Sequence, residues 1–217
     1  MANETPPRPG TDGGKSRTLP APEKRDWLRL IRSERVGPVT FYRLIERFGS
    51  AAQALQRLPE LASRGGGPAP AVCSKPEAEA EMEKLAGLGG AFVAFGEPAY
   101  PPLLAHIEDA PPLLALLGHA SLLARKTVAV VGARNATLGG RRFARALAAD
   151  LGREDYVVAS GMARGIDAAA HEGALPSGTV AVLGGGVDVL YPPENAALYE
   201  KIRDQGALVS EMACGTQ

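Results

Sequence analysis

TVAVVGARNAT, residues 127–137, opens the part of the chain that decides the fold. Thr127–Val131 is a continuous run of mostly β-branched residues that ends at Gly132. Such a run is typical of a strand buried on both faces of a parallel sheet. Apolar residues then recur at helical spacing as far as Leu151. The stretch therefore predicts a strand, a glycine-bearing loop and a helix in succession.

The same unit is repeated along the rest of the chain. Strands are expected at Tyr156–Ser160, Thr179–Leu183 and Ala207–Ser210, and helices at residues 166–175 and 195–205. Strand and helix alternate four times, so the connections should be right-handed crossovers and the sheet parallel. The fold class expected from these residues is therefore α/β.

Three glycine-rich loops follow the predicted strands, at residues 132–140, 161–165 and 184–188. In a parallel sheet such loops meet at the carboxyl ends of the strands, where ligands bind. Glycines let the backbone approach a ligand closely, and helix N-termini present NH groups to anions. Gly184 and Gly185 belong to the third of these loops. The pattern predicts a site for a phosphate-bearing ligand.

The first loop is not a dinucleotide-binding fingerprint. Gly132 is followed by Ala, Arg134 and Asn135, so an arginine stands where GxGxxG has its second glycine, which argues against an ordinary NAD site. Arg134 and Arg164 lie in neighbouring loops, and planar guanidinium groups suit phosphate. Surface ion pairing remains the alternative for these two and for three arginines at the start of the next helix. Those three are Arg141, Arg142 and Arg145.

The first 90 residues predict a tail and a small helical domain. Residues 1–24 are crowded with Pro, Gly, Ser and charge, so a disordered tail is expected. Helical spacing in residues 25–90 predicts packed helices, with Gly49 ending the second of them. The turn Arg35–Pro38 has two interpretations. It is either a packing turn or a helix-hairpin-helix element whose NH groups grip a DNA phosphate.

Residues 91–126 predict an extended lead-in segment. A short β-type run at Ala91–Phe95 is followed by proline pairs that begin at Pro101 and Pro111. Paired prolines forbid a continuous helix or a central strand at those positions. The leucines that follow them would pack the segment against the next domain. The outer edge of the last strand, at residues 207–210, is expected to be open.

Composition narrows the class of protein. The 217 residues include 24 Lys and Arg and 24 Asp and Glu, so net charge argues neither for nor against a nucleic-acid partner. Cys73 and Cys214 have no metal-ligand spacing, and reduced thiols are expected. No apolar run reaches the length of a membrane span. We expect a cytoplasmic protein without a metal or another cofactor.

Four long motifs in fixed order resemble the DNA processing protein A family (DprA, also called Smf). They are VAVVGARNAT (128–137), VVASGMARGIDAAAH (157–171), AVLGGGVDVLYPPEN (181–195) and LVSEMACGT (208–216). The upstream segment YPPLLAHIEDAPPLLALLG (100–118) is similar to the lead-in of the same family. The helical region from Trp27 is more loosely similar to the N-terminal SAM-like, helix-hairpin-helix-like domain of that family.

The resemblance implies an extended Rossmann-like domain at residues 127–217 that binds single-stranded DNA. It implies that the protein protects incoming strands during natural transformation (competence), helps to load RecA for recombination, and is not an enzyme. The resemblance assigns the DNA pocket to the arginine of the GxR motif and to the SGxARG loop. The arginine is Arg134 here, and the loop close by provides Ser160, Gly161, Ala163, Arg164 and Gly165. Gly132 and Asn135, on either side of this arginine in its loop, are predicted to contact the phosphate as well.

The family pattern continues past the SExxxGT segment into an FPxRNR motif and further strands, whereas this chain stops at Gln217. We therefore expect a truncated sheet that lacks part of the DNA pocket. The surface through which the family forms homodimers, and any C-terminal winged-helix domain, are expected to be missing as well. Few aromatic residues occur, so phosphate contacts should dominate over base stacking.

Two other classes of function remain as alternatives. Nucleotide phosphoribohydrolases of the LOG type share related glycine loops, but they carry PGGxGT followed by a glutamate, and residues 183–188 (LGGGVD) lack the proline and the threonine. Asp167 and His171, four apart on a helix, would act as an acid–base pair or bind a metal. The alternative is structural: Asp167 favours the helix dipole, and His171 packs on the face of the helix. The third class is an interaction module in which the helical domain binds a protein.

Overall fold

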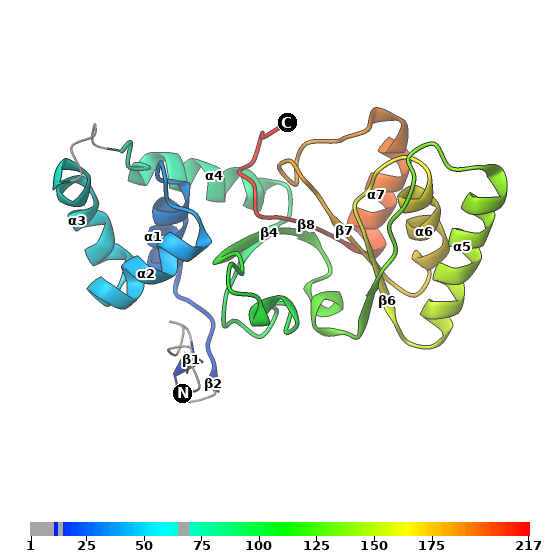
Figure 1. Cartoon of the computed structure of the whole chain (residues 1–217), viewed down its shortest axis with the longest axis horizontal. Coiled ribbons are helices and arrows are strands. Elements are labelled where there is room, and N and C mark those ends of the chain that lie inside the picture. Colours follow the sequence, from blue (N-terminus) through cyan, green and yellow to red (C-terminus); the bar gives the residue numbers. More distant parts are fainter. Residues whose placement is uncertain (1–10, 13–14, 65–69) are drawn as a thin grey trace. The chain divides into compact units, whose positions relative to one another are not determined.

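The computed structural model describes residues 11–12, 15–64 and 70–217, and its elements are labelled in Figure 1. The chain divides into two units. One runs to Glu83 and resumes at Val93–Leu113, and the other comprises Lys84–Phe92 and Leu114–Gln217. All three glycine-rich loops therefore belong to the second unit.

Helices dominate the first unit. Pro38 opens α2 directly after Gly37, and Gly49 ends it in the left-handed conformation with φ 80°, which confirms the predicted stop. The elements as far as residue 106 are β1 (Thr11–Asp12), β2 (Lys15–Ser16), α1 (Ala21–Arg32), α2 (Pro38–Phe48), α3 (Ala51–Arg64), α4 (Lys75–Gly87), β3 (Ala91–Ala94) and the 3-10 helix η1 (Leu104–His106).

A chain of aromatic rings forms the core of the first unit. Trp27 meets Phe41 edge-on with ring centroids 5.1 Å apart, and edge-on contacts continue through Tyr42 and Phe95 to Tyr100. All five rings are buried, and each such pair contributes about 1 kcal/mol beyond its buried area. Two residues that the sequence placed in the lead-in segment therefore complete the core of the helices.

The helical unit starts before the predicted boundary at residue 25. Helix α1 begins at Ala21, and Leu19 is buried. The buried carboxylate of Glu97 accepts a hydrogen bond from the Leu19 backbone NH at 2.8 Å and pairs with the Lys24 ammonium at 2.8 Å. This corrects the predicted tail for residues 19–24, because their partner lies about 75 positions away in the chain. Residues 1–10 and 13–14 of that tail lie outside the described residues.

The sheet has six strands in the order β3-β4-β8-β7-β6-β5. Strands β5 to β8 pair in parallel, as predicted. From β5 to β8 each strand lies beside the next one in the chain, so right-handed crossovers place α5, α6 and α7 on one face, and Figure 1 shows these helices in a row. The elements are β4 (Leu113–Gly118), η2 (Ala120–Ala124), β5 (Thr127–Ala129), α5 (Leu138–Arg153), β6 (Val157–Ser160), α6 (Ile166–Ala174), β7 (Thr179–Val182), η3 (Pro193–Asn195), α7 (Ala196–Gln205) and β8 (Ala207–Ser210).

Helices α5 and α6 pack closely on this face. Their contact is made of small buried residues, Ala148 on α5 with Ala170 and Ala174 on α6, over Val158 of β6. A Cβ atom at Gly173 would lie only 2.2 Å from the backbone oxygen of Arg145. Close packing of this kind holds the N-terminal ends of both helices, and the loops that lead into them, in fixed positions.

Strand β4 differs from the prediction. Leu113–Gly118, expected to be part of an extended lead-in, forms an internal strand that pairs antiparallel with β8. Pro111 and Pro112 directly precede the strand, so they cost it no ladder hydrogen bond. The sheet is therefore mixed rather than wholly parallel. The edge of β8 that was expected to be open is covered by β4.

Strand β5 also differs from the prediction. It spans Thr127–Ala129 and lies at the end of the sheet order, so it is an edge strand among the described strands. Its residues are partly exposed, and Val131 just beyond it is 71% exposed. The apolar run was expected to be buried on both faces. A run of this kind shows that a segment tolerates burial, but not how many neighbours it has.

Candidate functional site

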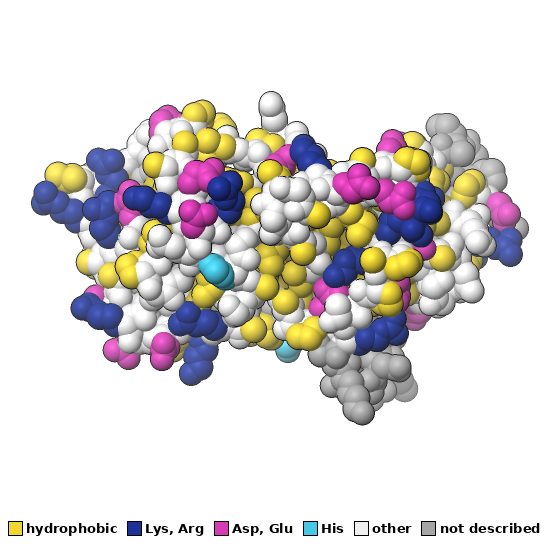
Figure 2. Space-filling model, turned by 180° about the vertical axis from the view of Figure 1, so that it is seen from behind, with side chains coloured by type: hydrophobic (Ala, Val, Ile, Leu, Met, Phe, Trp, Pro, Cys, Tyr) yellow, Lys and Arg dark blue, Asp and Glu magenta, His cyan; other side chains and the backbone are white. Residues whose placement is uncertain are grey.

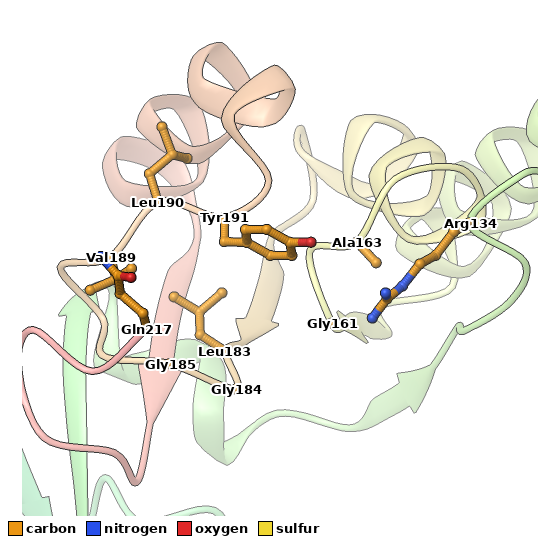
Figure 3. Close-up of a pocket in the computed structure, with 10 residues that line it drawn as sticks. All are labelled: Arg134, Gly161, Ala163, Leu183, Gly184, Gly185, Val189, Leu190, Tyr191 and Gln217. Atoms are coloured by element: carbon orange, nitrogen blue, oxygen red, sulfur yellow. The ribbon is translucent and has the colours of Figure 1, made fainter.

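The three glycine-rich loops line one cavity at the carboxyl ends of β5, β6 and β7. Its volume is about 570 Å³, which is typical of ligand sites. Figure 3 shows the Arg134 side chain on one side of the cavity, pointing toward Gly161. The Tyr191 ring lies on the other side. The remaining wall includes the backbone of Gly184 and Gly185 and the apolar side chains of Ala163, Leu183, Val189 and Leu190.

A second cavity, of about 670 Å³, begins at the same arginine and is strongly basic. It runs past the start of α5 to the loop before α6. Lys and Arg side chains gather at the left of Figure 2, where α5 lies. The charged residues that line this groove are Arg134, Arg141, Arg142, Arg145, Arg164, Glu172 and Glu194. Arg134 is therefore shared by a largely apolar cavity and a basic groove.

Two of the five groove arginines have acidic partners. Arg145 forms an ion pair with Glu172, and Arg164 lies 3.4 Å from Glu194. The interpretation as surface ion pairs holds for these two. Within the described residues the other three make no ion pair, which leaves their positive charge available to an anion: Arg134, Arg141 and Arg142.

The Asp167 carboxylate holds the first two loops together. One oxygen accepts a hydrogen bond from the Gly132 NH at 3.3 Å, and the other accepts from the NH groups of Gly161 at 3.1 Å and Ala163 at 3.4 Å. Asp167 is only 6% exposed. Asp167 lies in the first turn of α6, as the sequence predicted. Its bridge between two loops was not predicted. Asp167 thereby fixes the loop that carries Arg134 relative to the loop that carries Arg164.

Glycine is required where these loops touch. Gly165 has φ 83°, and a Cβ atom there would lie 2.2 Å from the backbone oxygen of Ala133 and 2.6 Å from that of Arg134. At Gly132 a Cβ atom would lie 2.7 Å from the Ile166 side chain. Gly165 excludes a larger residue because its neighbours are rigid backbone and its φ is positive, whereas a side chain at Gly132 would have to displace the branched Ile166 side chain. The spacing between the two arginine-bearing loops therefore depends on these glycines.

The segment after β7 returns to the same site. The Asn195 amide donates a hydrogen bond to the Met162 carbonyl at 2.8 Å, and the Tyr199 hydroxyl donates to the Val187 carbonyl. These contacts hold both sides of the loop that carries Tyr191. The sequence predicted a role in this loop only for its glycines, Gly184 and Gly185. The signal for Tyr191 was the YPPEN sequence at 191–195.

Asp167 and His171 do not form an acid–base pair. His171 is fully buried, and its Nδ1 lies 2.7 Å from the Thr179 hydroxyl, whereas Asp167 binds backbone NH groups. Burial lowers the pKa of His171 to about 4. No cluster of three or more metal-ligating side chains occurs in the described part of the chain.

The predicted site residues separate into two groups. Arg134, Gly161, Arg164, Gly165, Gly184 and Gly185 line one or both cavities. Ser160 is buried and donates to the Val130 carbonyl at 2.7 Å, Gly132 binds Asp167, and Asn135 is exposed outside the lining of both cavities. Ser160 and Gly132 therefore support the loops from behind.

Comparison with known proteins identifies the family. The family described as DNA recombination-mediator protein A matches residues 91–217, and a DprA-like N-terminal HHH domain matches residues 21–83. Protein Smf of Synechocystis sp. (strain PCC 6803) is 31% identical over 208 residues, which cover 90% of this chain and 52% of that protein. DNA processing protein DprA of Streptococcus pneumoniae is 42% identical over 120 residues, 54% of this chain and 42% of that protein.

Solved structures agree with this assignment. The X-ray structure of DprA from Streptococcus pneumoniae matches with a TM-score of 0.62 and 27% identity, over 84% of this chain and 70% of that chain. DprA from Helicobacter pylori, whose structure was described for its single-stranded DNA binding mode, matches with a TM-score of 0.54 and 27% identity. That match covers 59% of this chain and 58% of the Helicobacter pylori chain.

The chain spans about half the length of the Synechocystis relative and a smaller part of the Streptococcus pneumoniae protein. None of the described helices is long and apolar enough to cross a membrane. The family match covers more than half of the chain and includes every loop of the candidate site. The chain belongs to the DNA recombination-mediator protein A (DprA/Smf) family.

Proposed function

We propose that this chain binds single-stranded DNA in the basic groove and the adjoining cavity, as part of DNA processing during natural transformation. In this proposal it protects incoming strands, helps to load RecA on them, and performs no catalytic step. The phosphates of the strand follow the groove beside α5. The NH groups and arginines of the loops provide contacts that do not depend on base sequence.

One observation carries the proposal: Arg134 has no acidic partner within the described residues and stands where the two cavities meet. An arginine that pairs with a carboxylate, as Arg145 and Arg164 do, already has its charge largely neutralised. Arg134 instead extends from a loop that Asp167 and Gly165 hold in place, so little conformational entropy is lost when an anion binds. A phosphate at this point would meet Arg134 first and the arginines of α5 next.

Fluorescence anisotropy with a labelled oligothymidylate tests the proposal. Arg134→Ala is expected to weaken binding by about tenfold or more, because a charge-assisted hydrogen bond to phosphate contributes roughly 1.5–3 kcal/mol. Affinity should fall with salt, and the slope of log K against log salt should decrease by about 0.7 in the variant. Arg164→Ala should have a smaller effect, since Glu194 already offsets its charge.

Arg153→Ala is the matched control. Arg153 lies in the last turn of α5, the helix whose first turns line the basic groove, and it pairs with Asp150 on the surface. Its removal should leave affinity unchanged. Equal affinities for Arg134→Ala and Arg153→Ala in folded protein would contradict the proposed site, and no binding by the folded wild-type chain would contradict the proposed function.

The proposed role in RecA loading is supported by the family, which is described as a recombination mediator. Its test is ATP hydrolysis by RecA on short single-stranded oligonucleotides, which this chain should increase. A rate unchanged by the chain, at concentrations that saturate the DNA, would contradict this part of the proposal.

A further inference from the structure

Residues 184–188 form the third glycine-rich loop and with it part of the wall of the cavity beside Arg134. The first glycines of this loop line the cavity, whereas Asp188, at its other end, lies outside the lining. Figure 3 shows Gly185 and Gln217 on the side of the cavity opposite Arg134. The contacts that fix this loop therefore determine the shape of that wall.

The Asp188 carboxylate joins this loop to the segment after β8. Its Oδ1 atom accepts a hydrogen bond from the Gly215 NH at 2.8 Å. In the opposite direction the Gly186 NH donates to the Thr216 carbonyl at 2.9 Å. The Asp188 side chain is only 9% exposed. Two segments that are far apart in the chain are thus linked by hydrogen bonds in both directions.

The backbones of the two segments are in direct contact. A Cβ atom at Gly186 would lie 2.6 Å from the backbone oxygen of Ala213. At Gly185 a Cβ atom would lie 2.7 Å from the backbone oxygen of Thr216. The Ser210 hydroxyl, at the end of β8, also donates to the Gly185 carbonyl at 2.6 Å. The cavity wall is therefore supported by the segment after β8, and it moves if that segment moves.

Lys84 provides the counter-charge for this buried carboxylate. It lies in the last turn of α4, in the same unit as Asp188, and its Nζ is 2.6 Å from Asp188 Oδ2. Burial alone would raise the pKa of the Asp188 carboxyl, but hydrogen bonds from Lys84 and from the Gly215 NH lower it below its ordinary value. A buried carboxylate that loses its partner is strongly destabilised. Removal of Lys84 should therefore loosen the contact between the two segments.

We propose that Asp188 and Lys84 are positioning residues for DNA binding: their ion pair keeps residues 184–188 on the segment after β8 and so holds the cavity wall that faces Arg134. The inference rests on the proposed function. Neither side chain contacts the strand itself. A wall held in one conformation before the strand arrives costs little conformational entropy when the strand binds.

The charges of the two residues by themselves would give a different result. Removal of Asp188 takes away a negative charge, which by charge alone would strengthen binding of a phosphate chain. If Lys84 bound a phosphate directly, its removal would lower the slope of log K against log salt by about 0.7. Loss of positioning instead weakens binding in both variants at an unchanged salt slope, because residues 184–188 contain no Lys or Arg.

The test is fluorescence anisotropy of the full chain with a labelled oligothymidylate at several salt concentrations. Lys84→Met should weaken binding by about fivefold. Lys84→Arg should keep wild-type affinity, because a guanidinium still pairs with the carboxylate. Asp188→Ala should weaken binding by a similar factor, and the double variant Lys84→Met with Asp188→Ala should bind no more weakly than Asp188→Ala alone.

Lys75→Met is the matched control. Lys75 lies at the start of the same helix, pairs with Glu79 on the surface and is outside the lining of both cavities, so its removal should leave affinity unchanged. Hydrogen exchange of the variants locates the cause. Peptides that contain residues 184–188 and 211–217 should exchange faster in Lys84→Met than in wild type, while the circular dichroism spectrum stays the same.

The outcomes separate this inference from the proposed function. If Arg134→Ala weakens binding and Lys84→Met binds as wild type does, the positioning role is wrong and the proposed function stands. A lower salt slope in Lys84→Met, or tighter binding by folded Asp188→Ala, also overturns the inference, because either result shows that charge alone is at work. No binding by the folded wild-type chain overturns both.

Discussion

Asp167→Ala should release the two arginine-bearing loops and lower the free energy of unfolding of the sheet-containing unit by about 3 kcal/mol. The carboxylate accepts hydrogen bonds from three backbone NH groups, at Gly132, Gly161 and Ala163. Removing an acceptor costs roughly 1–3 kcal/mol for a buried donor left without a partner, and less for a donor that water can reach, as at the exposed Gly132 and Gly161. Water entering the opened loops offsets part of that sum. Affinity for single-stranded DNA should fall as well, although Asp167 carries the same negative charge as a phosphate ligand and its removal would otherwise favour an anion.

Hydrogen exchange followed by mass spectrometry locates this effect. Peptides that contain residues 130–136 and 160–165 should exchange faster in Asp167→Ala, and in Asp167→Asn to a smaller extent, because an amide keeps one acceptor oxygen. Asp150→Asn is the control, since Asp150 is exposed and, among the residues that the structure describes, its carboxylate pairs with Arg153 alone. Unchanged exchange in both loops, together with wild-type DNA affinity, would show that Asp167 does not organise the site.

His171 should make the sheet-containing unit sensitive to acid. Burial lowers the pKa of His171 to about 4, from an ordinary value of 6.5. Thr179 donates its hydroxyl hydrogen to the Val158 carbonyl at 2.7 Å, so it accepts the Nδ1 hydrogen of His171. Nε2 is buried without a hydrogen-bond partner among the described residues, so a second proton there would place a charge in a buried setting, which the Ser160 backbone offsets only in part.

The direction of the pH effect follows from the lowered pKa. The unfolded chain binds this proton below about pH 6.5, while the folded chain resists it until about pH 4, so stability is complete above pH 6.5 and is lost as the pH falls through this window. The loss attributable to this one group is on the order of 3 kcal/mol at pH 4.

Urea unfolding at several pH values, followed by far-UV circular dichroism, measures this loss. His171→Leu should be less stable than wild type at pH 7.5, because it loses the Thr179 contact, but it should lose less stability between pH 6.5 and 4.5. The two proteins share every other titrating group, so the difference between their profiles isolates His171. Parallel profiles would exclude His171 as the acid-sensitive group.

The sequence was sufficient for the local elements. The runs at 157–160, 179–182 and 207–210 became strands, and the helices between them lie where the apolar spacing put them. Strands and helices of this kind are specified by residues close together in the chain. The glycine loops and Arg134 were found for the same reason, since chain order determines that these loops meet at one end of a parallel sheet.

Pairing between distant segments was not predictable in this way. Leu113–Leu117 is as apolar as a packed linker would be, and only its partner β8, about ninety positions later, makes it an internal strand. Val131 is as apolar as a central-strand residue, yet it lies 71% exposed beside the edge strand β5. Hydrophobicity indicates that a segment can be buried. Which strands it pairs with depends on residues elsewhere in the chain.

The features of the candidate site also separate into those that the sequence predicted and those that depend on tertiary contacts. The residue types that bind an anion, arginines and glycines in loops after strands, were determined by the sequence alone. Tertiary structure decided that Asp167 joins two loops, that Glu172 and Glu194 neutralise two of the arginines, and that the loop after β7 brings Tyr191 opposite Arg134. These relations join residues that are far apart in the chain. They exist only once the sheet sets the strand order and the close packing of α5 on α6 fixes the spacing of the loops.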